Sequence, residues 1–154
     1  MDKKEYQKSL PKKRVSSAGL IFNEDGEILI LKTTYKDHWS MVGGTVDENE
    51  SPKEACKREI QEEIGLDLDV GNLLMVSYEW PRDENIEVLM FYFDCGVVEQ
   101  EMIKKISLQE EEIEKYQFLP VEQAKNLLSE TTKRKLEKAL EVLKEPATSV
   151  YLEY

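Results

Sequence analysis

GTVDENESPKEACKREIQEEIGL, the stretch over residues 44–66, predicts a loop followed by a helix around which the rest of this 154-residue chain is organised. Ser51 is a favoured N-cap residue, Pro52 suits the first helical position, and Glu54 follows the cap at the spacing of a capping box. Gly65 is a typical residue at the C-terminal end of a helix. We therefore expect a helix that begins directly after Ser51 and ends directly before Gly65.

Three glutamates share one edge of this expected helix. At about 100° of rotation per residue, the side chains of Glu59, Glu62 and Glu63 point in directions that lie within about 100° of one another. Like charges at positions i and i+4, such as Glu59 and Glu63, cost roughly 0.2–0.5 kcal/mol on an open helix. Hard oxygen donors along one edge suit Mg²⁺ or Mn²⁺, which bind carboxylates and keep positions for water and phosphate. The spacing therefore predicts a divalent-metal site.

The glutamates belong to a longer pattern. It runs Gly44, five residues, Glu50, seven residues, Arg58-Glu59-Ile60, one residue, Glu62-Glu63, one residue, and Gly65-Leu66. This is a complete Nudix box, so the chain resembles the MutT-like hydrolases over 23 of its 154 residues. The resemblance implies an α/β fold, the Nudix-type α/β/α sandwich with a mixed central sheet. The run REIQEE alone would indicate only a solvated acidic face, but the complete pattern in a loop-helix context favours the resemblance.

The resemblance also implies an activity and a set of site residues. In that family, metal-activated water cleaves the pyrophosphate of a nucleoside diphosphate linked to a further group. The metal ligands implied in this chain are Glu59, Glu62, Glu63 and the Gly43 carbonyl, and the same three glutamates are the implied catalytic residues. The residues implied to support the motif are Gly44, Glu50, Arg58 and Gly65, with Glu50 and Arg58 paired so that the loop is braced against the helix.

A second acidic run, Glu110 to Glu112, resembles the family's loop before its last strand. One of these glutamates could add a carboxylate as a metal ligand or as the base for water. We expect Glu112 to be that residue, because it immediately precedes the apolar alternation that starts at Ile113. The other two are expected to be solvated, as acidic runs usually are.

Several residues outside the motif are candidates for substrate binding: Trp39, Trp80 and Arg82. Trp39 precedes the glycine-rich loop, where it would either line a nucleobase pocket or anchor the packing. His38 is the only histidine, and we expect a local hydrogen bond from it, because metal-activated water does not require an imidazole base. Pro81 lies at the position where ADP-ribose-cleaving members of the family carry proline, which favours ADP-ribose or a related nucleotide.

Composition limits the partners. The net charge is −11 and the isoelectric point is about 4.7, which argues against a broad surface for extended nucleic acid or for anionic membranes. A small phosphorylated nucleotide stays compatible, because bound metal ions reverse the local sign of the charge. The chain has no run of 18 apolar residues, and its basic N-terminus is followed by no signal-peptide core. We therefore expect a cytoplasmic protein, as a monomer or a homodimer.

The order of segments predicts one domain. Residues 1–13 form a polar leader that we expect to fray, residues 14–146 the single hydrolase domain, and residues 147–154 a tail that packs on the body or on a twin chain. Two apolar runs flank Asp25-Gly26 and predict a hairpin. The run VLMFYF, residues 88–93, predicts a strand covered on both faces. Two helices are expected after residue 120, and Cys56 and Cys95 are expected to be buried, reduced thiols.

The function that follows is a Mg²⁺-dependent hydrolase of a pyrophosphate bond in a nucleoside diphosphate linked to another group, such as ADP-ribose, or in a nucleoside triphosphate. The alternative from another class is a non-catalytic module that binds a nucleotide metabolite on the same fold. An RNA 5′-end pyrophosphohydrolase and an isopentenyl diphosphate isomerase also lie within the resemblance. The acidity disfavours long RNA, and the cysteines and the histidine do not present the isomerase chemistry.

Overall fold

The structure is a computed structural model that describes residues 2–82, 86–145 and 151–153, the last three by their backbone only. Its helices are α1 (Lys3–Ser9), α2 (Pro52–Ile64), α3 (Gln100–Ile103), α4 (Val121–Leu127) and α5 (Glu130–Lys144). Its strands are β1 (Arg14–Asn23), β2 (Ile28–Thr33), β3 (Val42–Thr45), β4 (Leu73–Glu79), β5 (Val88–Val98), β6 (Ile113–Leu119) and β7 (Tyr151–Glu153).

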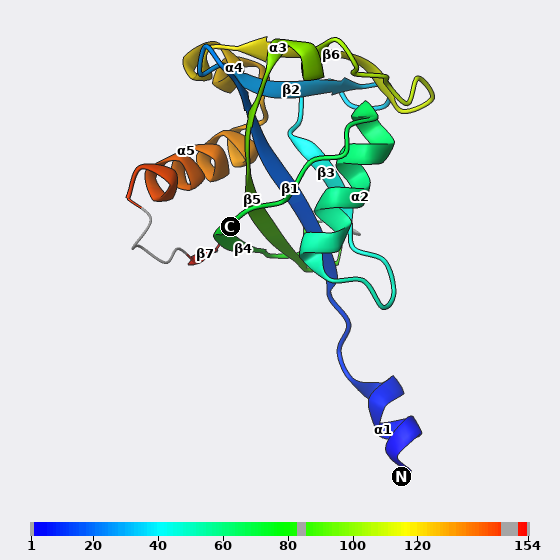
Figure 1. Ribbon diagram of the computed structural model, residues 1–154. Coiled ribbons are helices and arrows are strands. Elements are labelled where there is room, and N and C mark those ends of the chain that lie inside the picture. The colour runs from blue at the N-terminus through cyan, green and yellow to red at the C-terminus, as the bar shows by residue number, and fades with distance from the viewer. Residues whose placement is uncertain (1, 83–85, 146–150, 154) are drawn as a thin grey trace.

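The strands form one mixed sheet in the order β6-β2-β1-β5-β4-β7, with β3 paired to β1 (Figure 1). Strands β1 and β5 are parallel, from the pair Arg14–Val88 onward, whereas β2 and β3 are both antiparallel to β1. The expected hairpin around Asp25-Gly26 is present as β1 and β2, and Gly26 adopts the left-handed conformation that the tight turn needs, with φ 76°.

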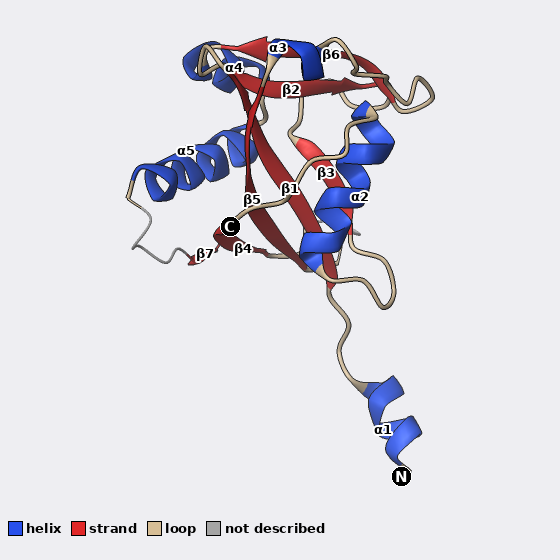
Figure 2. Ribbon diagram, in the orientation of Figure 1, coloured by secondary structure: helices blue, strands red, loops and turns tan. Residues whose placement is uncertain are grey.

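Helices cover both faces of this sheet (Figure 2). Helix α2 packs on one face, where Cys56, Ile60 and Ile64 join a core that includes Phe93. Helix α5 covers the other face with a core that includes Tyr92. Because neighbouring residues of β5 enter different cores, the strand is covered on both sides as its apolar run predicted. The α/β/α sandwich and the mixed sheet expected from the sequence are confirmed.

Helix α2 begins and ends where its local sequence predicts. Ser51 accepts a hydrogen bond from the Glu54 backbone N–H, while the Glu54 carboxylate accepts one from the Ser51 N–H, which completes the capping box. Gly65 ends the helix at φ 70°. The motif helix is therefore fixed at both ends by its own residues.

The two ends of the chain differ from simple frayed segments. The expectation of a frayed leader was wrong for residues 3–9: Asp2 and Glu5 form a capping box, and helix α1 projects away from the body with no buried residue (Figure 1). At the other end, β7 pairs in parallel with β4 at the sheet edge, while residues 146–150 and 154 lie outside the described part. Among the described residues, no helix has the length and apolar character needed to cross a membrane.

Candidate active site

Two consecutive glycines of β3 let the motif helix approach the sheet closely. The backbone N–H of Gly43 donates a hydrogen bond to Oε2 of Glu63 at 2.9 Å. A Cβ atom on Gly44 would lie 2.3 Å from Oε1 of Glu59, and one on Gly43 would lie 2.1 Å from the Ser17 carbonyl oxygen. Gly43 also has φ 146°, which side-chain-bearing residues rarely adopt. The glycines therefore allow Glu59 and Glu63 to lie directly against the strand.

Arg58 ties the loop before the helix to the helix itself. Its Nε and Nη2 atoms donate to the two carboxylate oxygens of Glu50 at 2.8 and 2.9 Å, and Nη2 also donates to the Thr45 carbonyl at 3.0 Å. The hydrogen bonds from Arg58 lower the pKa of Glu50. Nη1 reaches Glu59 and Glu62, each at 3.0 Å. The pair expected from the sequence is thus formed, and the same guanidinium orients two of the glutamates.

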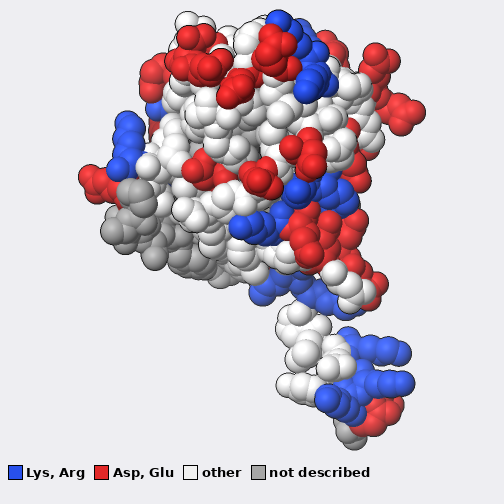
Figure 3. Space-filling model, viewed as in Figure 1, with Lys and Arg blue, Asp and Glu red and all other residues white. Residues whose placement is uncertain are grey.

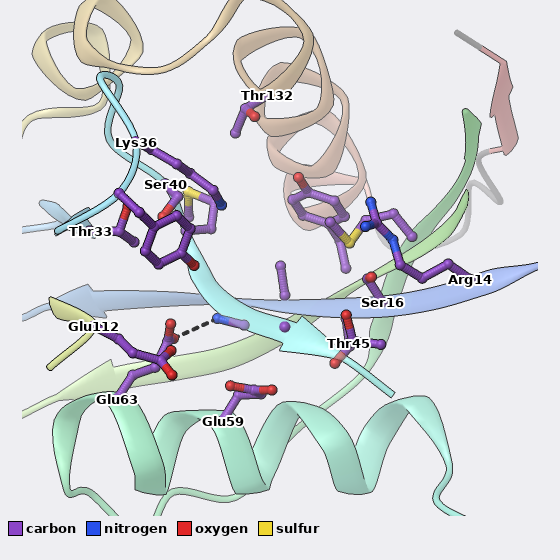
Figure 4. A pocket seen from close by; sticks show the side chains of 18 of the residues that line it. Arg14, Ser16, Thr33, Lys36, Ser40, Thr45, Glu59, Glu63, Glu112 and Thr132 are labelled. Atoms are coloured by element: carbon purple, nitrogen blue, oxygen red, sulfur yellow. Dashed lines mark hydrogen bonds between the residues drawn. The ribbon is translucent and has the colours of Figure 1, made fainter. Parts of the chain in front are cut away.

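The cavity beside this helix has a volume of about 560 Å³ and is lined by four acidic residues, Asp47, Glu59, Glu63 and Glu112. Figure 4 labels the three glutamates. Glu59 and Glu63 come from α2, and Glu112 enters from the loop before β6. Glu62 is not among the lining residues: its side chain is 48% exposed and held by Arg58. The structure therefore brings together Glu59, Glu63 and Glu112, and it leaves Glu62 at the rim.

Burial makes Glu59 and Glu63 resist ionisation in the metal-free protein. Burial raises the pKa of Glu63 to about 8; the Gly43 N–H opposes this shift, and the nearby charge of Glu59 adds to it. Burial also raises the pKa of Glu59, although Arg58 opposes the change. A cation among the carboxylates would favour their ionised forms. Within the described residues, no three His, Cys, Asp or Glu side chains already form a closed metal-binding cluster, but the donors are hard oxygens of the kind that Mg²⁺ prefers.

The opposite wall of the cavity carries hydroxyls and cations. Tyr35, Lys36 and His38 come from the segment between β2 and β3, and burial together with the nearby glutamates raises the pKa of Tyr35. Ser17 and Thr33 also border the cavity, but their hydroxyl oxygens are buried and have no hydrogen-bond partner among the described residues. Lys36 and Tyr35 can bind a polar ligand that faces the carboxylates. Arg14, at the start of β1, lines the end of the cavity away from Glu63 and Glu112 in Figure 4.

The three candidate substrate-binding residues lie in different places. Trp39 is partly buried against the core on the α5 side, with Nζ of Lys115 5.5 Å from its ring centroid, and it does not line the 560 Å³ cavity. Its packing role is therefore the one that the structure supports. Trp80 and Arg82 line a neighbouring cavity of about 280 Å³.

Sequence reasoning missed Arg14, Lys36 and Tyr35. Arg14 reaches the site through the pairing of β1 with β3 and β5, strands that are distant in the chain, so no local motif marks it. The sequence indicated Lys36 and Tyr35 only weakly, because they lie in the same short segment as His38, just before the glycine-rich loop.

Comparison with known proteins places these features in a family. A family model described as NUDIX domain matches residues 12–140. An 8-oxo-dGTP diphosphatase from Proteus vulgaris is 35% identical over 85 residues, which cover 52% of this chain and 75% of that protein. An RNA pyrophosphohydrolase from Hydrogenovibrio crunogenus is 36% identical over 61 residues, which cover 40% of this chain. The chain spans only 37% of that second relative's length.

Solved structures show the same architecture. The MutT protein from Methanosarcina mazei Go1 superimposes with a TM-score of 0.71 and 26% identity, over 91% of this chain and all of that one. A UDP-X diphosphatase gives a TM-score of 0.73 at 22% identity, over 99% of this chain and 75% of that one. The NUDIX domain of Shewanella oneidensis NrtR, solved with ADP ribose, gives a TM-score of 0.73 at 16% identity, over 93% of this chain and 99% of that one. The last two similarities concern the fold alone.

Proposed function

The chain belongs to the NUDIX domain family, and from this premise we propose that it is a Mg²⁺-dependent hydrolase that cleaves a pyrophosphate bond in a nucleoside diphosphate linked to another group. ADP-ribose and nucleoside triphosphates are the candidate substrates. Relatives named as a diphosphatase and a pyrophosphohydrolase support an enzyme, so the alternative of a non-catalytic binding module is not retained. Residues 14–146 are proposed as its single domain.

One observation carries the proposal: Glu59, Glu63 and Glu112 converge in a cavity whose opposite wall carries Tyr35, Lys36 and His38. A site with carboxylates on one side and Lys36 on the other suits a diphosphate that lies between bound cations and a fixed ammonium group. The charge of Lys36 already acts on Glu63, since it lowers the pKa of that carboxyl group. Lys36 and Glu63 line the same cavity, so a ligand bound there can lie between them.

The residues fit the divalent ion that the family generally uses. Glu59, Glu63 and Glu112 would hold it together with the Gly43 carbonyl, and Glu62 would join after releasing Arg58. When bound, the ion would supply charge neutralisation and a more acidic water. Mn²⁺ would serve in place of Mg²⁺, because both prefer oxygen ligands.

The chain's own groups then position the substrate and move a proton. Gly43 holds the Glu63 carboxylate through its N–H, and Arg58 holds Glu59. Lys36 would donate hydrogen bonds to phosphate oxygens. Either Glu59 or Glu112 would accept the proton of the attacking water, because both carboxylates face the cavity.

The proposal is tested by measuring phosphate or nucleotide release from a panel of ADP-ribose, nucleotide sugars, dinucleoside polyphosphates and oxidised nucleoside triphosphates. We expect Mg²⁺-dependent cleavage of at least one member. Glu63→Gln should keep the fold and lower kcat by about 100-fold or more. The matched control is Glu137→Gln, at a position of α5 that lines neither this cavity nor its 280 Å³ neighbour, and this variant should keep the native rate. A near-native rate for Glu63→Gln at saturating Mg²⁺ would refute the assigned role of Glu63.

A further inference from the structure

A second cavity carries an excess of positive charge, although the protein as a whole has a net charge of −11. This cavity, of about 280 Å³, lies between the ends of β1, β4 and β5 and the first turns of α5. Its charged lining residues are Arg14, Arg82, Lys135 and Glu79. Three cations therefore face one carboxylate.

The single carboxylate is already engaged. The ammonium group of Lys135, which is only 3% exposed, donates a hydrogen bond to Glu79. Within the described part of the chain, neither Arg14 nor Arg82 forms an ion pair with an acidic side chain. Asp83 and Glu84, which follow Arg82, lie outside that part. Among the described residues, no carboxylate thus competes with an anion for the guanidinium groups of Arg14 and Arg82.

The second cavity continues the catalytic cavity. Arg14, Met90 and Thr132 line both. The backbone N–H of Arg14 donates to the Glu87 carbonyl at 3.0 Å, which fixes the main chain at the junction. Figure 4 shows Arg14 at the end of the catalytic cavity opposite Glu112 and Glu63. A substrate whose anhydride lies beside the glutamates can therefore extend past Arg14 toward Arg82.

On the premise of the proposed hydrolase function, we propose that this second cavity is an anion subsite for an additional phosphate of the substrate, remote from the anhydride that is cleaved. The substrate class is then a nucleoside diphosphate derivative that also bears a phosphate monoester. A planar guanidinium binds phosphate with two parallel hydrogen bonds and is the preferred side chain for such a group.

Trp80 adds an apolar wall to the subsite. Its side chain is 56% exposed and meets the Tyr78 ring edge to face at a centroid distance of 5.2 Å. The ring thus has one edge supported by the protein and a broad area open to a ligand. A sugar or base that carries the extra phosphate can pack against this ring while the phosphate contacts Arg82.

The test compares ligand pairs that differ only in the extra phosphate: ADP-ribose with its 2′-phosphate, and ADP with its 2′- and 3′-phosphorylated derivatives. Binding is measured by calorimetry in EDTA, so that neither metal nor turnover contributes. We expect the phosphorylated member of at least one pair to bind about three- to tenfold more tightly. Arg82→Gln should abolish this difference between the members of each pair.

The matched control is Arg134→Gln, which removes the same charge from an exposed position of α5, where Arg134 pairs with Glu130. This variant should keep the preference. Equal affinity within every pair, no binding of any member, or an intact preference in Arg82→Gln would overturn the subsite. A retained preference in a protein that hydrolyses nothing with Mg²⁺ would refute the proposed hydrolase function and leave the subsite standing.

Discussion

Glu63 is deeply buried, and its pKa depends on the charged groups around it. The residue is 7% exposed, and its carboxylate accepts a hydrogen bond from Gly43 and shares the cavity with two further glutamates. In the metal-free protein these surroundings raise its pKa to about 8, with burial as the main cause. Between about pH 4.5 and pH 8, the group is therefore mostly ionised in the unfolded chain and mostly protonated in the folded protein.

This shift predicts a pH-dependent loss of stability without metal. Because the folded pKa of Glu63 lies above its ordinary value, its contribution to stability is fully present below about pH 4.5 and is lost as pH rises to about 8. Glu63→Gln cannot ionise, so it should be more stable than the wild type at pH 8.5 and close to it at pH 4.5. Urea unfolding in EDTA at both pH values measures the difference. A variant no more stable than the wild type at pH 8.5 would show that Glu63 titrates normally.

At the scale of single residues, the sequence predicted which residue types form the site better than it predicted how they are arranged. Glu59 and Glu63, which share one edge of the helix, both line the cavity, and Glu112 lines it from the acidic loop before β6; their role as metal ligands stays a prediction. Glu62 shares the helical edge but turns to Arg58, because a guanidinium one turn back offers a nearer partner than the cavity. Arg14 could not be found, since only the pairing of distant strands brings it there.

At the scale of elements, the site depends on the contact between β3 and α2. Gly44 leaves room for the Glu59 side chain, whereas Gly43 faces the backbone of β1. A side chain at position 44 would therefore disturb the placement of the Glu59 carboxylate, whereas one at position 43 would disturb the pairing of β3 with β1.

We expect the two alanine substitutions to separate these effects. Gly44→Ala should lower kcat by about tenfold or more with a modest loss of stability, because the end of the Glu59 side chain must move. Gly43→Ala should lower the free energy of unfolding by about 2–4 kcal/mol, since a backbone atom blocks its Cβ and φ is 146°. Gly26→Ala is the control: it has a positive φ of 76° but open space, and should cost about 1 kcal/mol. Equal losses of stability at positions 26 and 43 would contradict this account.

The elements near the motif were predictable because their signals are local. The cap at Ser51, the stop at Gly65 and the hairpin at Asp25-Gly26 each depend on a few neighbouring residues. The parallel pairing of β1 with β5 was not predicted, because it joins segments about 70 residues apart in the chain. Helix α1 was missed because its capping box lies in a polar segment without an apolar stripe.

At the scale of the whole molecule, charge is distributed unevenly. Acidic side chains form several separate patches on the face of the body shown in Figure 3, while the projecting N-terminal segment gathers lysines. Helix α1 has no buried residue, and the first ion pair between this segment and the body joins Lys13 to Glu87. The sandwich should therefore fold without α1.

Deletion of residues 2–11 tests this independence. Because the deletion removes α1 and keeps Lys13, Arg14 and β1, the melting temperature and the turnover of small nucleotides should stay unchanged. Calorimetry and a steady-state assay give the two readouts. A clear drop in Tm would place α1 within the folding unit and extend the domain proposed for residues 14–146.

The central claim is that the crowded carboxylates of α2 are held together in function by divalent cations. Electron paramagnetic resonance of Mn²⁺, which reports the free ion during a titration, tests it most directly. The account predicts that the wild type binds Mn²⁺ in the absence of nucleotide and that Glu63→Gln weakens this binding by about tenfold or more, while Glu137→Gln does not. No Mn²⁺ binding by the wild type, or equal binding by wild type and Glu63→Gln, would contradict the account.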